Sequence, residues 1–91
     1  DEVSVEIHGS GDVTVSGSAG AAGFEIDGSG SIDAGTLSSV DARAVIRGSG
    51  SVTLEATRTL DVEISGSGDV RYRGGATVTV RDTGSGTVRG Y

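Results

Sequence analysis

The sequence predicts an all-β protein built as a single-stranded parallel β-solenoid of about five rungs, each 18–20 residues long. The tripeptide Gly-Ser-Gly recurs five times, at intervals of 19, 20, 18 and 18 residues. Each copy lies between short runs in which every second residue is apolar, which is typical of half-buried strands. A fixed period of this length indicates a repeat architecture, in which each unit stacks on its neighbours to bury its apolar face.

The strands on either side of the tripeptide carry like residues at equivalent positions. Two residues before it stand Ile7, Ile26, Ile46, Ile64 and Asp82, and two residues after it stand Val13, Ile32, Val52, Val70 and Val88. The positions between the apolar ones are mostly polar, so each strand has one apolar face. A hairpin meander would pair the two strands of one unit. Columns of like residues favour the solenoid instead, because in-register stacking places Ile on Ile and Val on Val.

The tripeptides are predicted to form the corners at which the chain turns from one strand to the next. Glycine suits such corners because it accepts φ values that other residues avoid, and because stacked corners leave little room for side chains. A flexible linker would not recur in register between alternating strands. The ten predicted corner glycines are Gly9, Gly11, Gly28, Gly30, Gly48, Gly50, Gly66, Gly68, Gly84 and Gly86.

Each unit is then expected to return to the next rung through a loose segment, such as residues 17–23 or 35–39. A third and shortest inner face is predicted on these returns. It is carried by Leu37 and Val40, then Leu60, then Ala76 and Val78. No stretch has the 3.6-residue apolar period of a helix.

Composition limits the classes of function. Residues 1–91 are expected to form one domain, a processed or excised part of a longer chain. The chain has no Cys, which excludes disulfides and cysteine-based metal sites. No segment has the roughly 20 apolar residues of a membrane span. The formal net charge of −6 argues against nucleic acid as a partner.

The charge is divided unequally along the chain. Residues 1–42 hold eight acids and no Arg, whereas residues 43–91 hold five acids and all seven Arg. Neither end has an evident cap against unpaired backbone groups. A head-to-tail contact between copies is therefore predicted, with Arg81 beside Glu6 of the next copy and Arg89 beside Thr14, and such a contact would generate a filament. The alternative is that a further half-domain covers the N-terminal edge.

The sequence gives weaker evidence for metal or catalytic sites than for the repeat. The acidic column Glu6, Glu25 and Glu63, and the sequence Gly-Ser-Gly-Asp at residues 9–12 and 66–69, invite Ca²⁺, which needs six to eight oxygen ligands. Solvated side chains and corner hydrogen bonds explain both features, so no cofactor or metal is predicted.

An enzyme would need an acid/base pair or a metal gathered in a cleft. The only His, His8, is expected to point outward. Arg71, Arg73 and Arg89 are expected to cluster, with Glu55 as their only nearby acid and in an ion pair with Arg73 across neighbouring rungs. The prediction is that the chain is not an enzyme.

The whole chain resembles the bacterial family known as putative auto-transporter adhesin, head GIN domain. The resemblance is carried by Val62–Gly74 (VEISGSGDVRYRG), the final Gly-Ser-Gly-Thr-Val at 84–88, and the repeats at 9–13 and 28–34. It implies a right-handed parallel β-helix, pectin-lyase-like in shape, on exported or surface-anchored proteins, with no known catalytic residues and adhesion as a suggested role. The chain departs from the family at Gly75 and Ala76, where Pro is common. In length it corresponds to the C-terminal half of the family's domain.

The expected function is a non-catalytic extracellular or cell-surface module, structural or adhesive, with other copies of itself or cell-surface components as partners. One alternative is an adhesin domain that binds glycans or cells as a monomer. Exposed aromatic residues usually mark such sites, and Tyr91 is the one candidate, because Phe24 and Tyr72 fall in inner columns. An enzyme acting on polysaccharide is the second alternative.

Overall fold

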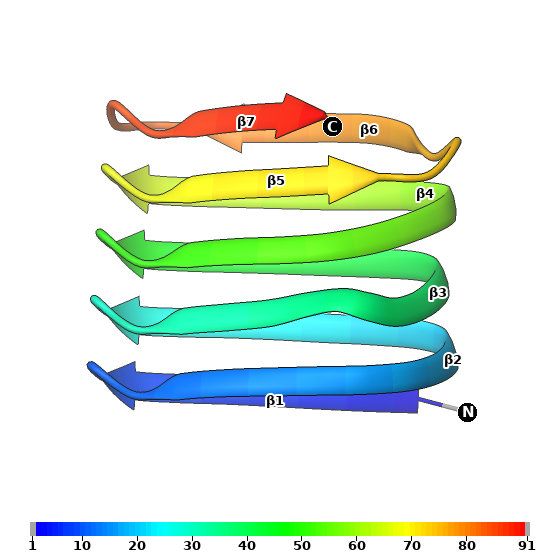
Figure 1. Cartoon of the computed structure of the whole chain (residues 1–91). Helices are drawn as coiled ribbons and strands as arrows, with labels where there is room; N and C mark the ends of the chain where they lie inside the picture. Colours follow the sequence, from blue (N-terminus) through cyan, green and yellow to red (C-terminus); the bar gives the residue numbers. More distant parts are fainter. Residues whose placement is uncertain (1, 91) are drawn as a thin grey trace.

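The computed structural model describes residues 2–90, with Asp82 described by its backbone alone, and this range contains strands but no helix. It accordingly contains no helix long and apolar enough to cross a membrane. The strands are β1 (Glu2–Gly9), β2 (Asp12–Gly28), β3 (Ser31–Gly48), β4 (Ser51–Gly66), β5 (Asp69–Arg73), β6 (Thr77–Asp82) and β7 (Thr87–Gly90). The three longest, β2 to β4, each run along one side of the molecule, bend, and return along the other side (Figure 1).

All strand pairs are parallel and join residues one repeat apart. Ile26, for example, lies in register between Ile7 and Ile46. This pairing confirms the solenoid and excludes the hairpin meander. In Figure 1 the front strands run from left to right and the back strands from right to left, while the chain rises from the N-terminal to the C-terminal end. The solenoid is therefore right-handed, and it has about five coils.

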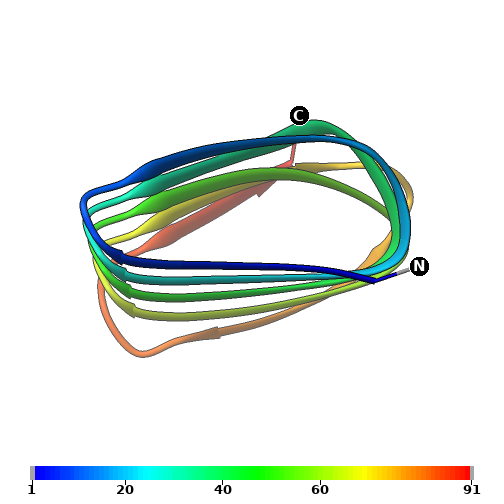
Figure 2. The same ribbon diagram turned by 90° about the horizontal axis from the view of Figure 1, so that it is seen from below.

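The Gly-Ser-Gly tripeptides lie at the narrow corner of the coil, seen along the axis in Figure 2. Backbone hydrogen bonds connect successive corners: the Ser29 amide donates to the Gly9 carbonyl (3.0 Å) and the Ser49 amide to the Gly28 carbonyl (3.1 Å). Gly48 has φ +128°, and a Cβ there would collide with the Gly28 carbonyl of the coil below. Corners stacked this closely require glycine.

The core is a set of columns along the solenoid axis. Ile26, Ile46 and Ile64 are fully buried before the corner of their coils. Val52 and Val70, which follow a corner and lie on the other side of the coil, are also fully buried. Among the described residues, all buried side-chain nitrogen and oxygen atoms have hydrogen-bond partners. The interior of the middle coils is therefore apolar and closed, as the alternating pattern predicts.

The returns differ from the prediction, because residues 17–23 and 35–39 belong to continuous strands. Ser18 pairs with Ser38 and Ala19 with Ser39 through the wide bend, after one register shift between Thr14 and Ser16. Between β3 and β4, register shifts lie on either side of the pairs that Ser38 and Ser39 make. Since neighbouring coils bend at the same place, their backbone groups can stay paired there.

The prediction of the third inner face is also partly wrong. Leu37 and Leu60 are buried, but Val40 is 41% exposed, and Ser39 is the buried residue instead. The Ser39 hydroxyl donates a hydrogen bond to the backbone carbonyl of Glu55, which satisfies it inside the bend. A register shift between Ser39 and Asp41 turns Val40 outward.

Candidate functional site at the open ends and outer faces

Both ends of the solenoid are open within the described residues. At the N-terminal end β1 pairs with β2 only, and at the C-terminal end β6 pairs with β4 and β7 with β5. Each end therefore presents a strand edge with backbone N–H and C=O groups that can pair with another strand.

The apolar columns are also uncovered at the two ends. Val80 is 44% exposed, whereas Val62, its equivalent one coil below, is fully buried. Val5 is half-buried at the other end, and Phe24 above it is 2% exposed. The half-buried apolar residues of the first coil are Val3, Val5, Val13 and Val15, and those near the last coil include Tyr72, Val78 and Val88. These exposed apolar side chains make the two ends candidate contact surfaces.

The structure places the predicted contact residues at opposite ends. Glu6 lies on β1, where its Oε1 accepts a hydrogen bond of 2.7 Å from Nε2 of the outward-facing His8. Arg81 lies on β6 in register with Glu63, in the same outward column as Glu6. Arg89 lies on β7 in register with Arg71. Within one chain these residues do not meet, so their contact between copies stays a prediction.

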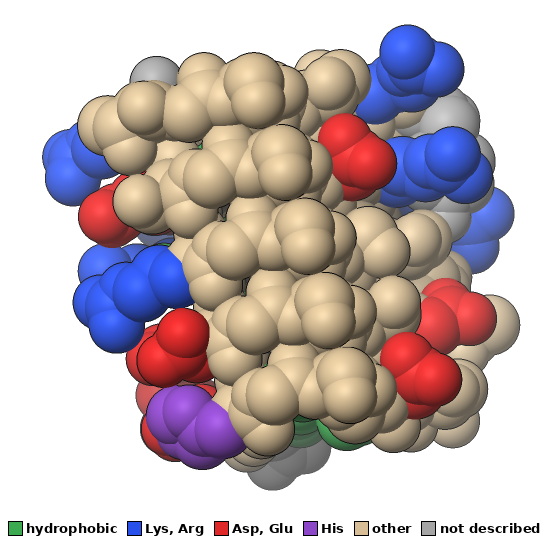
Figure 3. Space-filling view, turned by 90° about the vertical axis from the view of Figure 1, so that its left-hand side faces the viewer, with side chains coloured by type: hydrophobic (Ala, Val, Ile, Leu, Met, Phe, Trp, Pro, Cys, Tyr) green, Lys and Arg blue, Asp and Glu red, His purple; other side chains and the backbone are tan. Residues whose placement is uncertain are grey.

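Charge divides along the axis on the outer faces. In Figure 3 an uncharged stripe of corner residues runs up the middle, with acidic side chains mainly in the lower part at either side and basic ones mainly in the upper part. Ion pairs join neighbouring coils: Nε of Arg73 lies 3.4 Å from Oε2 of Glu55, which confirms the predicted pair, and Arg47 lies 3.9 Å from Glu25.

Two of the three carboxylates of the acidic column are paired within the described residues. Glu6 is engaged by His8 and Glu25 by Arg47. Over residues 2–90, excluding the Asp82 side chain, no three His, Cys, Asp or Glu residues are grouped so that they could hold a metal ion. Tyr91, the one aromatic residue predicted to be exposed, lies outside the described residues. Phe24 is buried and Tyr72 packs against the core, as their columns predict.

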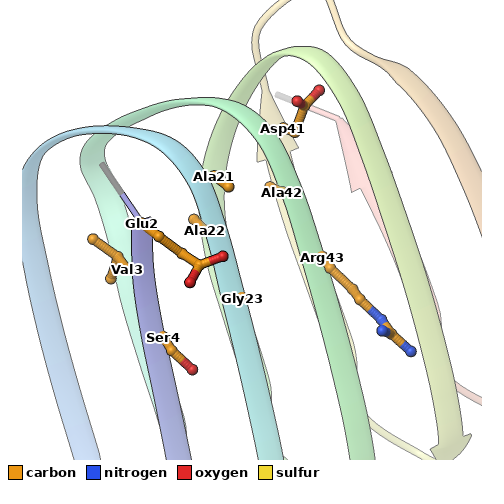
Figure 4. A pocket seen from close by; sticks show the side chains of 9 residues that line it. All are labelled: Glu2, Val3, Ser4, Ala21, Ala22, Gly23, Asp41, Ala42 and Arg43. Atoms are coloured by element: carbon orange, nitrogen blue, oxygen red, sulfur yellow. The ribbon is translucent and has the colours of Figure 1, made fainter.

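A hollow on the outer face near the N-terminal end was not predicted. It has a volume of about 340 Å³ and lies where Ala21, Ala22 and Gly23 leave space between side chains of the coils on either side (Figure 4). Glu2 and Ser4 border it from one coil and Asp41 and Arg43 from another. An adjoining hollow shares Ser4, Gly23 and Arg43 with it. The signal in the sequence is Gly23, a glycine in an outward column of β2, where the prediction has a loose return.

The cluster of Arg71, Arg73 and Arg89 also has an acid beside it that was not predicted. Asp69 lies beside Arg71 on the same outward face and borders the hollows on both sides of it. Glu55 is therefore not the only acid near these arginines. Arg73 has a further role, since its Nη2 donates a hydrogen bond of 2.9 Å to the Gly35 carbonyl two coils below.

The family known as putative auto-transporter adhesin, head GIN domain, matches residues 1–76 of this sequence. The chain belongs to this family. The match confirms the resemblance seen in the repeats. The sequence has no significant match among curated proteins.

Solved structures similar to this head GIN domain include proteins from Parabacteroides and Bacteroides species. A putative adhesin from Parabacteroides merdae is 32% identical with a TM-score of 0.98, over 100% of this chain and 38% of that one. A putative adhesin from Bacteroides fragilis is 32% identical with a TM-score of 0.92, over 99% and 42%. A putative lipid binding protein from Parabacteroides distasonis is 33% identical with a TM-score of 0.99, over 100% and 37%. This chain spans about two fifths of the length of each.

Proposed function

We propose that this head GIN domain is a non-catalytic adhesive or structural module of the bacterial cell surface, and that copies of it stack end to end. Family membership and the adhesin neighbours support the adhesive role and the location. The observation that carries the stacking is the partly uncovered core: the columns of Val62 and Val70, fully buried in the middle coils, are half-exposed at both ends, although Ile7 of the first coil stays buried.

The register of a joint follows from the register inside the chain. Glu63 lies in register with Arg81, and Glu6 lies in register with Glu25; all four residues belong to one outward column. Continuing that column places Arg81 of one copy beside Glu6 of the next, and Val80 beside Val5. Gly84 would then lie on Gly9, so the corner ladder would continue across the joint without a gap.

Two contributions would stabilise this joint. Covering the apolar side chains at the two ends contributes about 25 cal/mol per Å² of apolar surface removed from water. Each backbone hydrogen bond of the new ladder adds about 0.5–1.5 kcal/mol. Association costs roughly 4–15 kcal/mol in lost translational and rotational freedom, so both ends must be covered along their length for a stable contact.

Charge would decide the polarity of stacking. The first 42 residues carry eight acids and no Arg, whereas the last 49 carry a net positive charge. Head-to-tail stacking brings these unlike halves together. Two N-terminal ends placed face to face would instead bring acid against acid, which is unfavourable.

Sedimentation velocity over a concentration series, with electron microscopy of the same samples, tests the proposal. Elongated oligomers that grow with concentration are expected. Val80→Asp places a charge on the uncovered end and should abolish them. Val40→Asp is the matched control, because Val40 is similarly exposed (41% against 44%) but lies on the side of the solenoid. A wild-type chain that stays monomeric at millimolar concentration would refute stacking and favour coverage of the end by other protein.

A charge exchange tests the predicted register. Either Glu6→Arg or Arg81→Glu alone should weaken assembly, and the two together should restore it. Arg81→Glu also places two glutamates side by side within one chain, because Arg81 is in register with Glu63. The unfolding midpoint of each variant must therefore be measured alongside its assembly. If the double variant assembles no better than the single ones, Arg81 and Glu6 do not meet.

A further inference from the structure

Four of the seven arginines lie in register with an acid on a neighbouring strand. Four in-register pairs join Arg with Asp or Glu: Asp27 with Arg47, Arg43 with Asp61, Glu55 with Arg73, and Glu63 with Arg81. Arg71 and Arg89, by contrast, lie in register with each other on β5 and β7. Like charges directly opposite one another in a sheet are destabilising.

Neither arginine of this pair is neutralised within the described residues. Of the four ion pairs found there, two are made by His8, one by Arg47 and one by Arg73. None involves Arg71 or Arg89. Both side chains are exposed. Arg71 lies on β5, which has a neighbouring strand on each side, so it is not part of an open end.

The surface around the pair is hollowed. One hollow of about 120 Å³ lies between Asp69 and Arg71 on β5 and Thr87 and Arg89 on β7. Another of about 210 Å³ lies on the other side of Arg71, bordered by Ser51, Thr53 and Asp69. Basic side chains gather on the upper right of Figure 3, on the strands that follow the corner. The site thus offers two guanidinium groups, several hydroxyls and one carboxylate.

We propose that Arg71 and Arg89 bind the carboxylate of a uronic acid residue in an anionic polysaccharide, with Asp69 accepting hydrogen bonds from the sugar hydroxyls. A planar carboxylate matches the fork of a guanidinium group, which can donate two parallel hydrogen bonds to it. Asp69 disfavours a bare sulfate or phosphate, because it sets a negative charge beside the anion. It suits a sugar that carries hydroxyls next to its carboxylate. This inference deepens the adhesive part of the proposed function and does not depend on stacking.

Calorimetric or NMR titration with tetragalacturonate tests the site, with its methyl ester and sodium sulfate as comparison ligands. Tetragalacturonate should bind, and the uncharged ester should not. Arg71→Gln should weaken binding about tenfold, the expected loss of a charge-assisted hydrogen bond. Arg43→Gln is the matched control, because it removes the same charge from a different hollow, and it should change the affinity by no more than about twofold. Circular dichroism of each variant shows whether it is folded.

Asp69→Asn separates a sugar site from a general anion site. The substitution should weaken tetragalacturonate binding and leave sulfate binding unchanged or stronger. Equal affinity for sulfate and uronate, an equal loss in Arg43→Gln, or no binding of tetragalacturonate would each overturn the proposal. Because Arg71 is not at an open end, Arg71→Gln should leave the sedimentation behaviour of the wild type intact. Failure of the sugar site and failure of stacking are therefore distinguishable.

Discussion

Three glycine-to-alanine substitutions can separate the two reasons for glycine at the corners. Gly48 has φ +128°, and an added Cβ would collide with the Gly28 carbonyl of the coil below. Gly9 also has a positive φ, +99°, but lies in the first coil, where an added Cβ would meet nothing within 4 Å. Gly23 has neither constraint, since its φ lies outside the left-handed range and the space beside it is open. Gly23 therefore gives the baseline, Gly9 the cost of backbone strain alone, and Gly48 the cost of strain and crowding together, so crowding between coils is the difference between Gly48 and Gly9.

The expected losses in the free energy of unfolding follow from these differences. Positive φ costs a residue with a Cβ about 1–2 kcal/mol, which is the loss expected for Gly9→Ala. Gly48→Ala adds crowding against rigid backbone, about 1–3 kcal/mol. It also strains the hydrogen bond from the Ser49 amide to the Gly28 carbonyl, which is 3.1 Å long. We therefore expect a loss of about 3–4 kcal/mol for Gly48→Ala. Gly23→Ala should lie within about 0.5 kcal/mol of the wild type.

Urea unfolding followed by far-ultraviolet circular dichroism measures all three. The loss in Gly48→Ala corresponds to a fall in the melting temperature of roughly 12–32 °C, at about 4–8 °C per kcal/mol for a domain of this size. If Gly48→Ala and Gly9→Ala lose the same stability, crowding between stacked corners contributes nothing and the reasoning is wrong. A large loss in Gly23→Ala would likewise show that an open, extended glycine position is under a constraint absent from the structure.

Three further predictions concern the interior and the outer face. Leu54→Ala should lower the free energy of unfolding by about 2–5 kcal/mol in urea titration, because Leu54 is 1% exposed and its removal leaves a cavity. Ser39→Ala should lower it by about 1 kcal/mol, since it removes the buried hydrogen bond to the Glu55 carbonyl; no loss would show that this bond does not stabilise the bend. A double-mutant cycle with Glu55→Gln and Arg73→Gln should give a coupling of about 0.2–1 kcal/mol that decreases in high salt, and a salt-independent coupling would contradict an ionic origin.

The residues around the corner allowed most of the fold to be predicted. The spacing of Gly-Ser-Gly and the columns of Ile and Val gave the parallel register, and the structure has Ile7, Ile26 and Ile46 stacked as those columns require. The ion pair between Glu55 and Arg73 followed from the same register. Strand alternation has a period of two, so a register error of one residue would have turned every side chain to the wrong face.

The wide bend could not be predicted in the same way. Whether Ser39 or Val40 points inward depends on a register shift that neighbouring coils impose, and hydrophobicity alone favours Val40. The hollow at Gly23 depends on the side chains of the coils above and below it. Features of this kind arise between residues one or two repeats apart. The place of Asp69 beside Arg71 is different, because the two residues are two positions apart on one strand and strand alternation puts them on the same face.

The sequence by itself determined the repeat, the stacking register and the corner, because each depends on residue type at a fixed period along the chain. Only the tertiary structure decided which parts of that pattern remain uncovered. Val62 and Val80 occupy one column and are the same residue type, yet one is fully buried and the other 44% exposed. The reason is physical: burial in a solenoid comes from the coil above as well as the coil below, and within residues 2–90 the last coil has a neighbour on one side only.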